Sequence, residues 1–182
     1  MASTLSLLTK KRFLPLFITQ FLNAFNDNFF KMAMIILVTF ELLNNPSKEA
    51  QFNALVGGLL MLPFFLFSAL AGQLADKKDK SKIIRIVKNA EIIIMLIGAV
   101  GIYMESIETM LIAFFALGTQ SSFLGPIKYA ILPQHLKDDE VLSGTGLVEA
   151  GTYIAILAGT ILGGLLPPTA SAIGVILSLI HI

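Results

Sequence analysis

Continuous apolar runs of about 20 residues constrain this chain more than any other feature of its sequence. Five such runs occupy residues 13–40, 52–75, 83–103, 110–132 and 143–166. A helix needs about 20 residues to cross a bilayer, and unbroken runs favour helices over a barrel, whose strands alternate in shorter segments. Hydrophobic residues make up 55% of the chain, against roughly 45–50% in soluble domains. We therefore predict an all-α membrane protein.

The two ends of the sequence lead to further expectations. Residues 1–12 lack a small-residue cleavage site after a short apolar core, so we predict a cytoplasmic N-terminal segment and an uncleaved first span. A sixth apolar run, from Ser171 to Ile182, has 12 residues and is too short to cross a bilayer. We predict a fragment with a truncated sixth helix. Residues 177–182 resemble the translation of a sequencing-library adapter, so the native membrane domain is predicted to cover 13–176.

Basic residues predict the orientation of the chain. If the N-terminus is cytoplasmic, eleven of the thirteen Lys and Arg residues lie on the cytoplasmic side. These are Lys10, Lys11, Arg12, Lys77, Lys78, Lys80, Lys82, Arg85, Lys88, Lys128 and Lys137. Only Lys48 falls in an outer loop and only Lys31 falls within a span, so the positive-inside rule predicts a multi-pass protein with a cytoplasmic N-terminus.

The first apolar run contains a stripe of polar residues. Its members follow one another at spacings of three, four and four residues, which places them on one face of a helix: Gln20, Asn23, Asp27 and Lys31. At 1.5 Å per residue the stripe is about 17 Å long. Lipid cannot hydrogen-bond these groups, so the stripe must face other helices or a water-filled cavity. Its length favours a cavity.

Two interpretations of Asp27 follow from its place in this stripe. Lys31 lies four residues later, the better orientation for a helical ion pair, so the two charges can neutralise each other. An ionisable group within a membrane is nevertheless a functional-site hypothesis by default, because each such charge costs about 3 kcal/mol on insertion scales. Our leading hypothesis is that Asp27 has a functional role in a substrate pathway. We expect Asn28, beside Asp27, to line the same pathway.

The other spans supply candidate partners for Asp27. Lys128 and Glu149 are the cross-helix candidates, although structural pairing is equally open for Glu149. The third run carries three charged residues at intervals of three, which we interpret as an interfacial ladder extending to water. These are Arg85, Lys88 and Glu91.

Small residues in the fifth run indicate how it packs. Glycine or alanine recurs every four residues, at Gly151, Ala155, Gly159 and Gly163. This spacing allows the backbones of two membrane helices to approach closely. We therefore expect this face to contact another helix.

The loop between the second and third runs carries a distinctive pattern. Gly72-Gln-Leu-Ala-Asp76 precedes basic residues at Lys80 and Lys82. The pattern resembles the G-x-L-A-D-x-x-x-(K/R)-x-(K/R) loop of the major facilitator superfamily, with Asp79 where glycine is usual. In that family the loop latches the two halves of the transporter in one state. The resemblance implies this role for Gly72, Asp76, Lys80 and Lys82.

Three further segments are more specific, and they read QFLNAFNDN at 20–28, GPIKYAIL at 125–132 and TGLVEAGT at 145–152. Together they resemble the lysophospholipid transporter branch of the superfamily, including transporter domains fused to glycerophospholipid acyltransferases. The resemblance implies the N-terminal six-helix half of a twelve-span fold, with the C-terminal half missing. It also implies flipping of lysophospholipids from the outer to the inner leaflet by alternating access, with Asp27, Lys128 and Glu149 contacting the headgroup.

Two alternatives remain open. A drug or metabolite exporter of the same fold would use Asp27 to carry a proton or attract a cation. The chain could also be the membrane domain of a bifunctional acyltransferase, fused to or partnered with the enzyme, although no catalytic set is visible in it. We expect a bacterial inner-membrane protein whose partners are the bilayer and a lysophospholipid, with no enzyme activity, cofactor, metal or nucleic acid of its own.

Overall fold

The computed structural model describes residues 4–43 and 45–166. Every regular element within these residues is a helix: η1 (Thr4–Thr9), α1 (Leu14–Leu37), η2 (Val38–Leu42), α2 (Pro46–Lys77), α3 (Lys80–Tyr103), α4 (Ile107–Ala130), α5 (Leu132–His135) and α6 (Asp138–Leu165). The five complete apolar runs coincide with the long helices α1, α2, α3, α4 and α6. The sixth run from Ser171 and the 177–182 tail lie outside the described residues.

Helix length and composition confirm the predicted class. Among the described residues, α2, α4 and α6 are long and apolar enough to cross a membrane. Their outer surfaces carry large apolar side chains, such as Phe65, which is 86% exposed, and Leu157, which is 62% exposed. Such surfaces suit contact with lipid. The protein is an all-α, multi-pass membrane protein, and the crossing of α1 and α3 stays a prediction.

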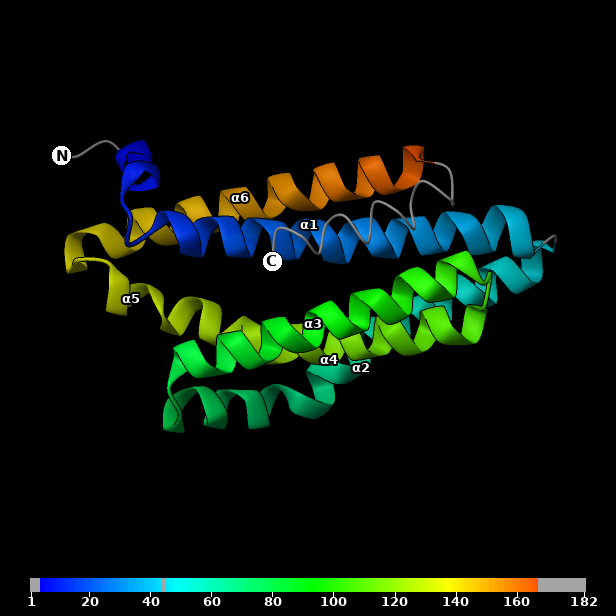
Figure 1. The fold of residues 1–182 in the computed structure, drawn as a ribbon, viewed down its shortest axis with the longest axis horizontal. Helices are drawn as coiled ribbons and strands as arrows, with labels where there is room; N and C mark the ends of the chain where they lie inside the picture. Colours follow the sequence, from blue (N-terminus) through cyan, green and yellow to red (C-terminus); the bar gives the residue numbers. More distant parts are fainter. Residues whose placement is uncertain (1–3, 44, 167–182) are drawn as a thin grey trace.

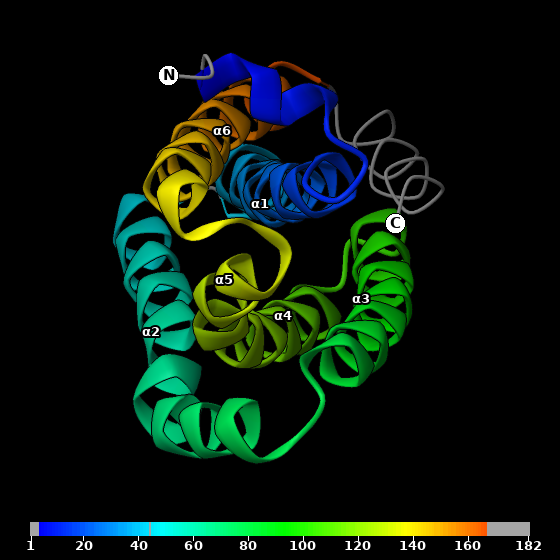
Figure 2. The ribbon, with the colours of Figure 1, turned by 90° about the vertical axis from the view of Figure 1, so that its left-hand side faces the viewer.

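The long helices form two groups, which Figure 1 shows lying along a common direction. Helix α6 packs along the length of α1, and α4 packs against both α2 and α3. The end-on view in Figure 2 separates the α1 and α6 pair from the group of α2, α3 and α4. Contacts of α1 with α3 and α4 are few by comparison, so the side chains between the two groups are well placed to form a site.

Glycines on α6 allow its close approach to α1. A Cβ atom added to Gly159 would lie 2.5 Å from the backbone oxygen of Phe25, and one added to Gly163 would lie 2.5 Å from that of Phe29. Real Cβ contacts are never this short, so the two backbones touch through these glycines. Ala155 is fully buried on the same face. The small-residue face therefore lies against α1.

Apolar clusters flank a polar layer in the middle of the bundle. The largest cluster gathers where α1 ends and α4 begins, and includes Phe30, Met34, Met95, Met110 and Phe114. Two smaller clusters lie towards the other end, around Phe13 with Leu132 and around Ile83 with Ile127. On α1, α3 and α4 alike, the buried polar residues fall between these clusters along the helix. The polar layer is thus enclosed by apolar packing at both ends.

Asp79, which stands where glycine is usual in the loop between α2 and α3, has a structural role. It is the N-cap of α3, and its carboxylate accepts hydrogen bonds from the backbone N–H groups of Ser81 at 2.8 Å and Lys82 at 3.4 Å. Asp is a preferred N-cap residue, since it satisfies donors that the first helical turn leaves free. Its backbone φ of −61° does not require glycine.

The N-terminal segment is held to the start of α6 by one carboxylate. Glu140 forms ion pairs with Lys10 and Arg12 and accepts a hydrogen bond from the backbone N–H of Lys137 at 3.1 Å. The hydrogen bond from Lys10, with that from Lys137 and the charge of Arg12, lowers the pKa of the Glu140 carboxyl below its ordinary value. Beneath these pairs, Leu7 packs in the cluster around Phe13. Charge and apolar contact together fix the segment.

Candidate functional site

The polar stripe of α1 faces the other helices as its spacing predicts. Gln20 and Asn23 are buried, while Asp27 and Lys31 are partly exposed and line a cavity. Pro15 lies in the first turn of α1, where its missing N–H leaves no helical bond unmade. The regular helix from Leu14 to Leu37 then carries all four side chains on one face.

Lys88 and Glu91 of α3 form a buried ion pair. The Lys88 ammonium donates to Glu91 Oε2 at 2.7 Å, and the two residues are 7% and 0% exposed. The prediction that Lys88 and Glu91 belong to an interfacial ladder reaching water is therefore wrong. The physical reason is that their face of α3 meets α1 and α4, where each charge finds a partner that compensates for the loss of water.

This ion pair extends into a hydrogen-bond network across three helices. Lys88 also donates to Asn23 Oδ1 of α1 at 2.7 Å. Gln120 of α4 donates through Nε2 to Glu91 Oε2 at 2.9 Å and, more weakly, to Asn23 Oδ1 at 3.4 Å. We call Asn23, Lys88, Glu91 and Gln120 the polar network. It links α1 to α3 and α4, which α1 otherwise contacts at few points.

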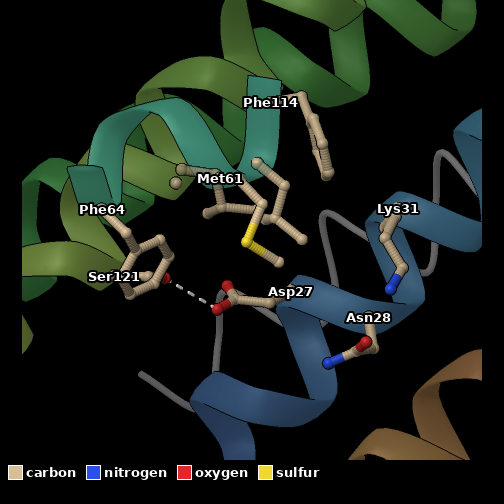
Figure 3. Close-up of a pocket in the computed structure, with 10 residues that line it drawn as sticks. Asp27, Asn28, Lys31, Met61, Phe64, Phe114 and Ser121 are labelled. Carbon is tan, nitrogen blue, oxygen red and sulfur yellow. Dashed lines mark hydrogen bonds between the residues drawn. The ribbon is translucent and has the colours of Figure 1, made fainter. Parts of the chain in front are cut away.

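Asp27 lies at the edge of the polar network. Its Oδ2 atom accepts hydrogen bonds from Asn23 Nδ2 at 3.2 Å and from the Ser121 hydroxyl at 2.9 Å, the contact drawn in Figure 3. Its Oδ1 atom is buried and has no hydrogen-bond partner. A buried acceptor without a donor is costly. The carboxylate is therefore bonded through Oδ2, while Oδ1 is enclosed without a partner among the described residues.

The local ion pair that the Asp27 and Lys31 spacing allows is not formed. Both residues are described, and they do not pair, while Lys31 has no hydrogen-bond or ion-pair partner among the described residues. Figure 3 shows the Lys31 ammonium apart from the Asp27 carboxylate. Two opposite charges thus line one cavity without neutralising each other by direct contact.

Two adjacent cavities open beside Asp27. Their volumes are about 270 Å³ and 260 Å³, and both are lined by Asp27, Asn28, Phe64 and Ser121. The first also carries Lys31 and a set of apolar side chains: Leu60, Met61, Phe114 and Leu117. Figure 3 shows that Met61, Phe64 and Phe114 come from helices facing Asp27 and Asn28. The α1 wall of this cavity is charged and polar, and the facing walls of α2 and α4 are apolar apart from Ser121.

The second cavity reaches Lys128, the predicted cross-helix partner of Asp27. The Lys128 ammonium lies 3.0 Å from Glu149 Oε1 and donates to Thr152 at 3.2 Å, and the Tyr129 hydroxyl also donates to Glu149. Lys128 and Glu149 therefore pair with each other, and neither pairs with Asp27. Gln20 lines this cavity as well. Of the predicted pathway residues, Glu149 alone lines neither of the two cavities.

Comparison with known proteins identifies the family. The family model described as Major Facilitator Superfamily matches residues 16–180. The chain belongs to this superfamily. It is also similar to proteins named Lysophospholipid transporter LplT in Salmonella heidelberg (strain SL476) and Salmonella agona (strain SL483), each 29% identical over 156 residues. The similarity covers 86% of this chain and 36% of each relative, so the chain spans about a third of their length. No solved structure gives a significant match.

These comparisons confirm the resemblance read from the sequence, both to the superfamily and to its lysophospholipid transporter branch. The relatives are transporters by name. Within the part of the chain that the structure describes, no group of His, Cys, Asp and Glu is arranged to hold a metal ion. The four residues of the predicted superfamily latch lie at the end of α2 and the start of α3. None of its charged members, Asp76, Lys80 and Lys82, forms an ion pair with another described residue.

Sequence reasoning missed Gln120 and Ser121, which complete the surroundings of Asp27. A signal for them existed: Thr119, Gln120, Ser121 and Ser122 form a polar run in the middle of an otherwise apolar superfamily helix. A polar run at that depth needs partners on other helices. The same argument that selected the α1 stripe would have selected this run.

Proposed function

We propose that this chain is the N-terminal half of a superfamily transporter that moves lysophospholipids from the outer to the inner leaflet of a bacterial inner membrane. The observation that carries the proposal is the cavity beside Asp27, whose charged and polar wall faces an apolar wall. A lysophospholipid has the same division, with a charged headgroup joined to a single apolar chain. The similarity to proteins named lysophospholipid transporters supports this choice of substrate.

The cavity suggests how a zwitterionic headgroup would bind. Its ammonium would take the free Oδ1 atom of Asp27, which has no other partner. Its phosphate would take Lys31, whose ammonium has no hydrogen-bond or ion-pair partner in the part of the chain that the structure describes, with Asn28 beside both. Charge-assisted hydrogen bonds of this kind are about twice as strong as neutral ones. The acyl chain would lie against Met61 and neighbouring apolar side chains, and could extend between helices into lipid.

Transport would follow from the alternating access that superfamily folds use. The two halves rock about a binding site near the middle of the membrane. This motion opens the cavity alternately to one side of the membrane and to the other. In our proposal the N-terminus is cytoplasmic, a C-terminal half completes the cavity, and the loop with Gly72, Asp76, Lys80 and Lys82 meets that half. The product lysolipid, delivered to the inner leaflet, would suit a fused or partner acyltransferase.

Lysophospholipid uptake by proteoliposomes tests this proposal. We expect the full-length transporter to move a fluorescent lysophosphatidylethanolamine inward without a proton gradient, and the 182-residue chain alone to show no transport. Asp27→Asn should lower the rate more than tenfold, because the ammonium loses its counter-charge. Glu41→Gln makes the same chemical change at an exposed position outside the cavity and should leave the rate unchanged.

Three results would redirect the proposal. A proton-gradient requirement that Asp27→Asn abolishes, together with no lysolipid movement, would identify a drug or metabolite exporter of the same fold. Robust lysolipid transport by the 182-residue chain alone would contradict the need for a second half. Equal rates for Asp27→Asn and the unsubstituted transporter would remove Asp27 from the binding site.

A further inference from the structure

The Lys88 and Glu91 ion pair lines neither central cavity, yet it bonds the side chains that surround Asp27. We propose that this pair is a positioning element, which fixes the orientation of the Asn23 and Gln120 amides and thereby decides which oxygen of Asp27 is free for the substrate ammonium. The inference rests on the proposed function and adds residues of α3 that never touch the substrate.

The orientation of Asn23 follows from the chemistry of Lys88. An ammonium group only donates hydrogen bonds, so the side-chain oxygen of Asn23 must face it, as it does at 2.7 Å. The amide nitrogen then points the other way and donates to Asp27 Oδ2 at 3.2 Å. A rotated amide would place its N–H₂ against the ammonium and its oxygen against the carboxylate. Both contacts would be repulsive, so Lys88 selects one of two orientations.

Glu91 fixes Gln120 in the complementary way. An ionised carboxylate only accepts, so the Gln120 amide nitrogen faces Glu91 Oε2 at 2.9 Å. The Gln120 oxygen is then turned towards Ser121, whose single O–H is shared between this oxygen at 3.1 Å and Asp27 Oδ2 at 2.9 Å. Ser121 thus has its hydroxyl held beside the carboxylate. The orientation of each amide is set by an ionic group that bonds it from α3.

Asn23, from the polar network, and Ser121, beside it, both donate to the same oxygen of Asp27. Oδ2 accepts from Asn23 and from Ser121, while Oδ1 has no partner. Because Lys88 and Glu91 carry opposite charges, they orient the amides without adding net charge beside Asp27. The pair therefore leaves Oδ1 as the Asp27 oxygen without a hydrogen-bond partner among the described residues. A substrate cation would meet an acceptor already held in place.

The test replaces the ion pair and compares two ligands in the full-length transporter, held in nanodiscs. Lys88→Met with Glu91→Leu removes both charges together, and exchanges of this kind for apolar groups of similar volume are often neutral or stabilising, so the variant should fold. One ligand is lysophosphatidylethanolamine, which carries an ammonium. The other is lysophosphatidic acid, which has the phosphate and no ammonium. The ratio of the two affinities reports on Asp27 specifically.

We expect the double variant to bind lysophosphatidylethanolamine about tenfold more weakly, since a correctly oriented bond to a charged group is lost. Binding of lysophosphatidic acid should stay within about twofold. Lys88→Arg keeps a head that only donates and can pair with Glu91, so it should retain the preference. Glu140→Gln breaks two ion pairs remote from the cavity and should leave both affinities unchanged.

Three outcomes would overturn the inference. In the first, the double variant keeps the affinity ratio of the unsubstituted protein. In the second, both ligands lose affinity by the same factor, which is the result of a purely structural role. In the third, the unsubstituted protein, folded and monodisperse, binds neither lipid; this outcome overturns the proposed function and the inference together, whereas the first two leave the proposed function intact.

Discussion

Two sets of opposite charges lie near the middle of this bundle, and they are resolved in opposite ways. Lys88 and Glu91 bond each other directly and line neither of the cavities beside Asp27, and Glu91 Oε1 has no hydrogen-bond partner among the described residues. Asp27 and Lys31 line a cavity and form no ion pair with each other, and Asp27 Oδ1 has no donor among the described residues. In the first set the cost of removing charge from water is offset inside the protein. In the second set this cost is not offset by a direct ion pair, so water or a ligand in the cavity has to offset it.

The difference teaches that helical spacing permits an ion pair without deciding whether it forms. Asp27 and Lys31 have the favoured i, i+4 spacing, yet the pair that forms is Lys88 with Glu91 at i, i+3. Whether the ion pair forms depends on how closely neighbouring helices pack over the charged face. Around Lys88 the faces of α1 and α4 close over the charges, whereas α2 stands off from Asp27 across a cavity. A closed pair is suited to structure, and an open pair to binding.

The largest effect should come from breaking the closed pair on one side only. Lys88→Met leaves Glu91 as a buried carboxylate without its cation, which should lower the free energy of unfolding by about 3–5 kcal/mol. Lys31→Met makes the same substitution in the open set, where no bond is lost, and should change that free energy by less than about 1 kcal/mol. Denaturation of the purified chain in detergent micelles measures both. Equal losses would contradict the distinction between closed and open pairs.

Removing the ion pairs of Glu140 should have the smallest effect on stability, and the pH dependence of that effect can be tested. The pKa of this carboxyl in the folded protein lies below its ordinary value of 4.5, chiefly because Lys10 bonds it. Its contribution is therefore present above pH 4.5 and is lost as the pH falls through the folded pKa. Glu140→Gln should destabilise the protein slightly at pH 7, with release of residues 4–12 to protease as a sensitive readout.

The protease sensitivity of the unsubstituted protein and of Glu140→Gln can also be compared at decreasing pH. The unsubstituted protein and Glu140→Gln should become equally protease-sensitive as the pH drops below the folded pKa of Glu140, since protonation removes the charge that the substitution removes. A difference that persists unchanged at low pH would mean that Glu140 acts through something other than its charge, whereas no difference at any pH would mean that apolar contacts such as those of Leu7 hold the N-terminal segment.

The placement of the polar residues on one face of α1 could be predicted from the sequence. Residues on one helix have fixed relative positions, so the spacing of Gln20, Asn23, Asp27 and Lys31 was sufficient to place them on one face. Contacts between helices depend on packing and rotation, which spacing within one helix does not contain. Lys88 was therefore assigned to an exposed ladder, and Lys128 to Asp27 when it pairs with Glu149.

The central claim is that Asp27 and Lys31 serve a ligand rather than each other. The direct test is lysophosphatidylethanolamine uptake by proteoliposomes containing full-length Asp27→Asn, Lys31→Gln transporter, a double variant that removes both charges at once. Glu41→Gln with Lys48→Gln is the matched control, since it makes the same changes at exposed positions outside the cavity. We predict that uptake falls more than tenfold in the first variant and is retained in the control. Uptake that survives in both would show that the two charges merely cancel, and would contradict the account.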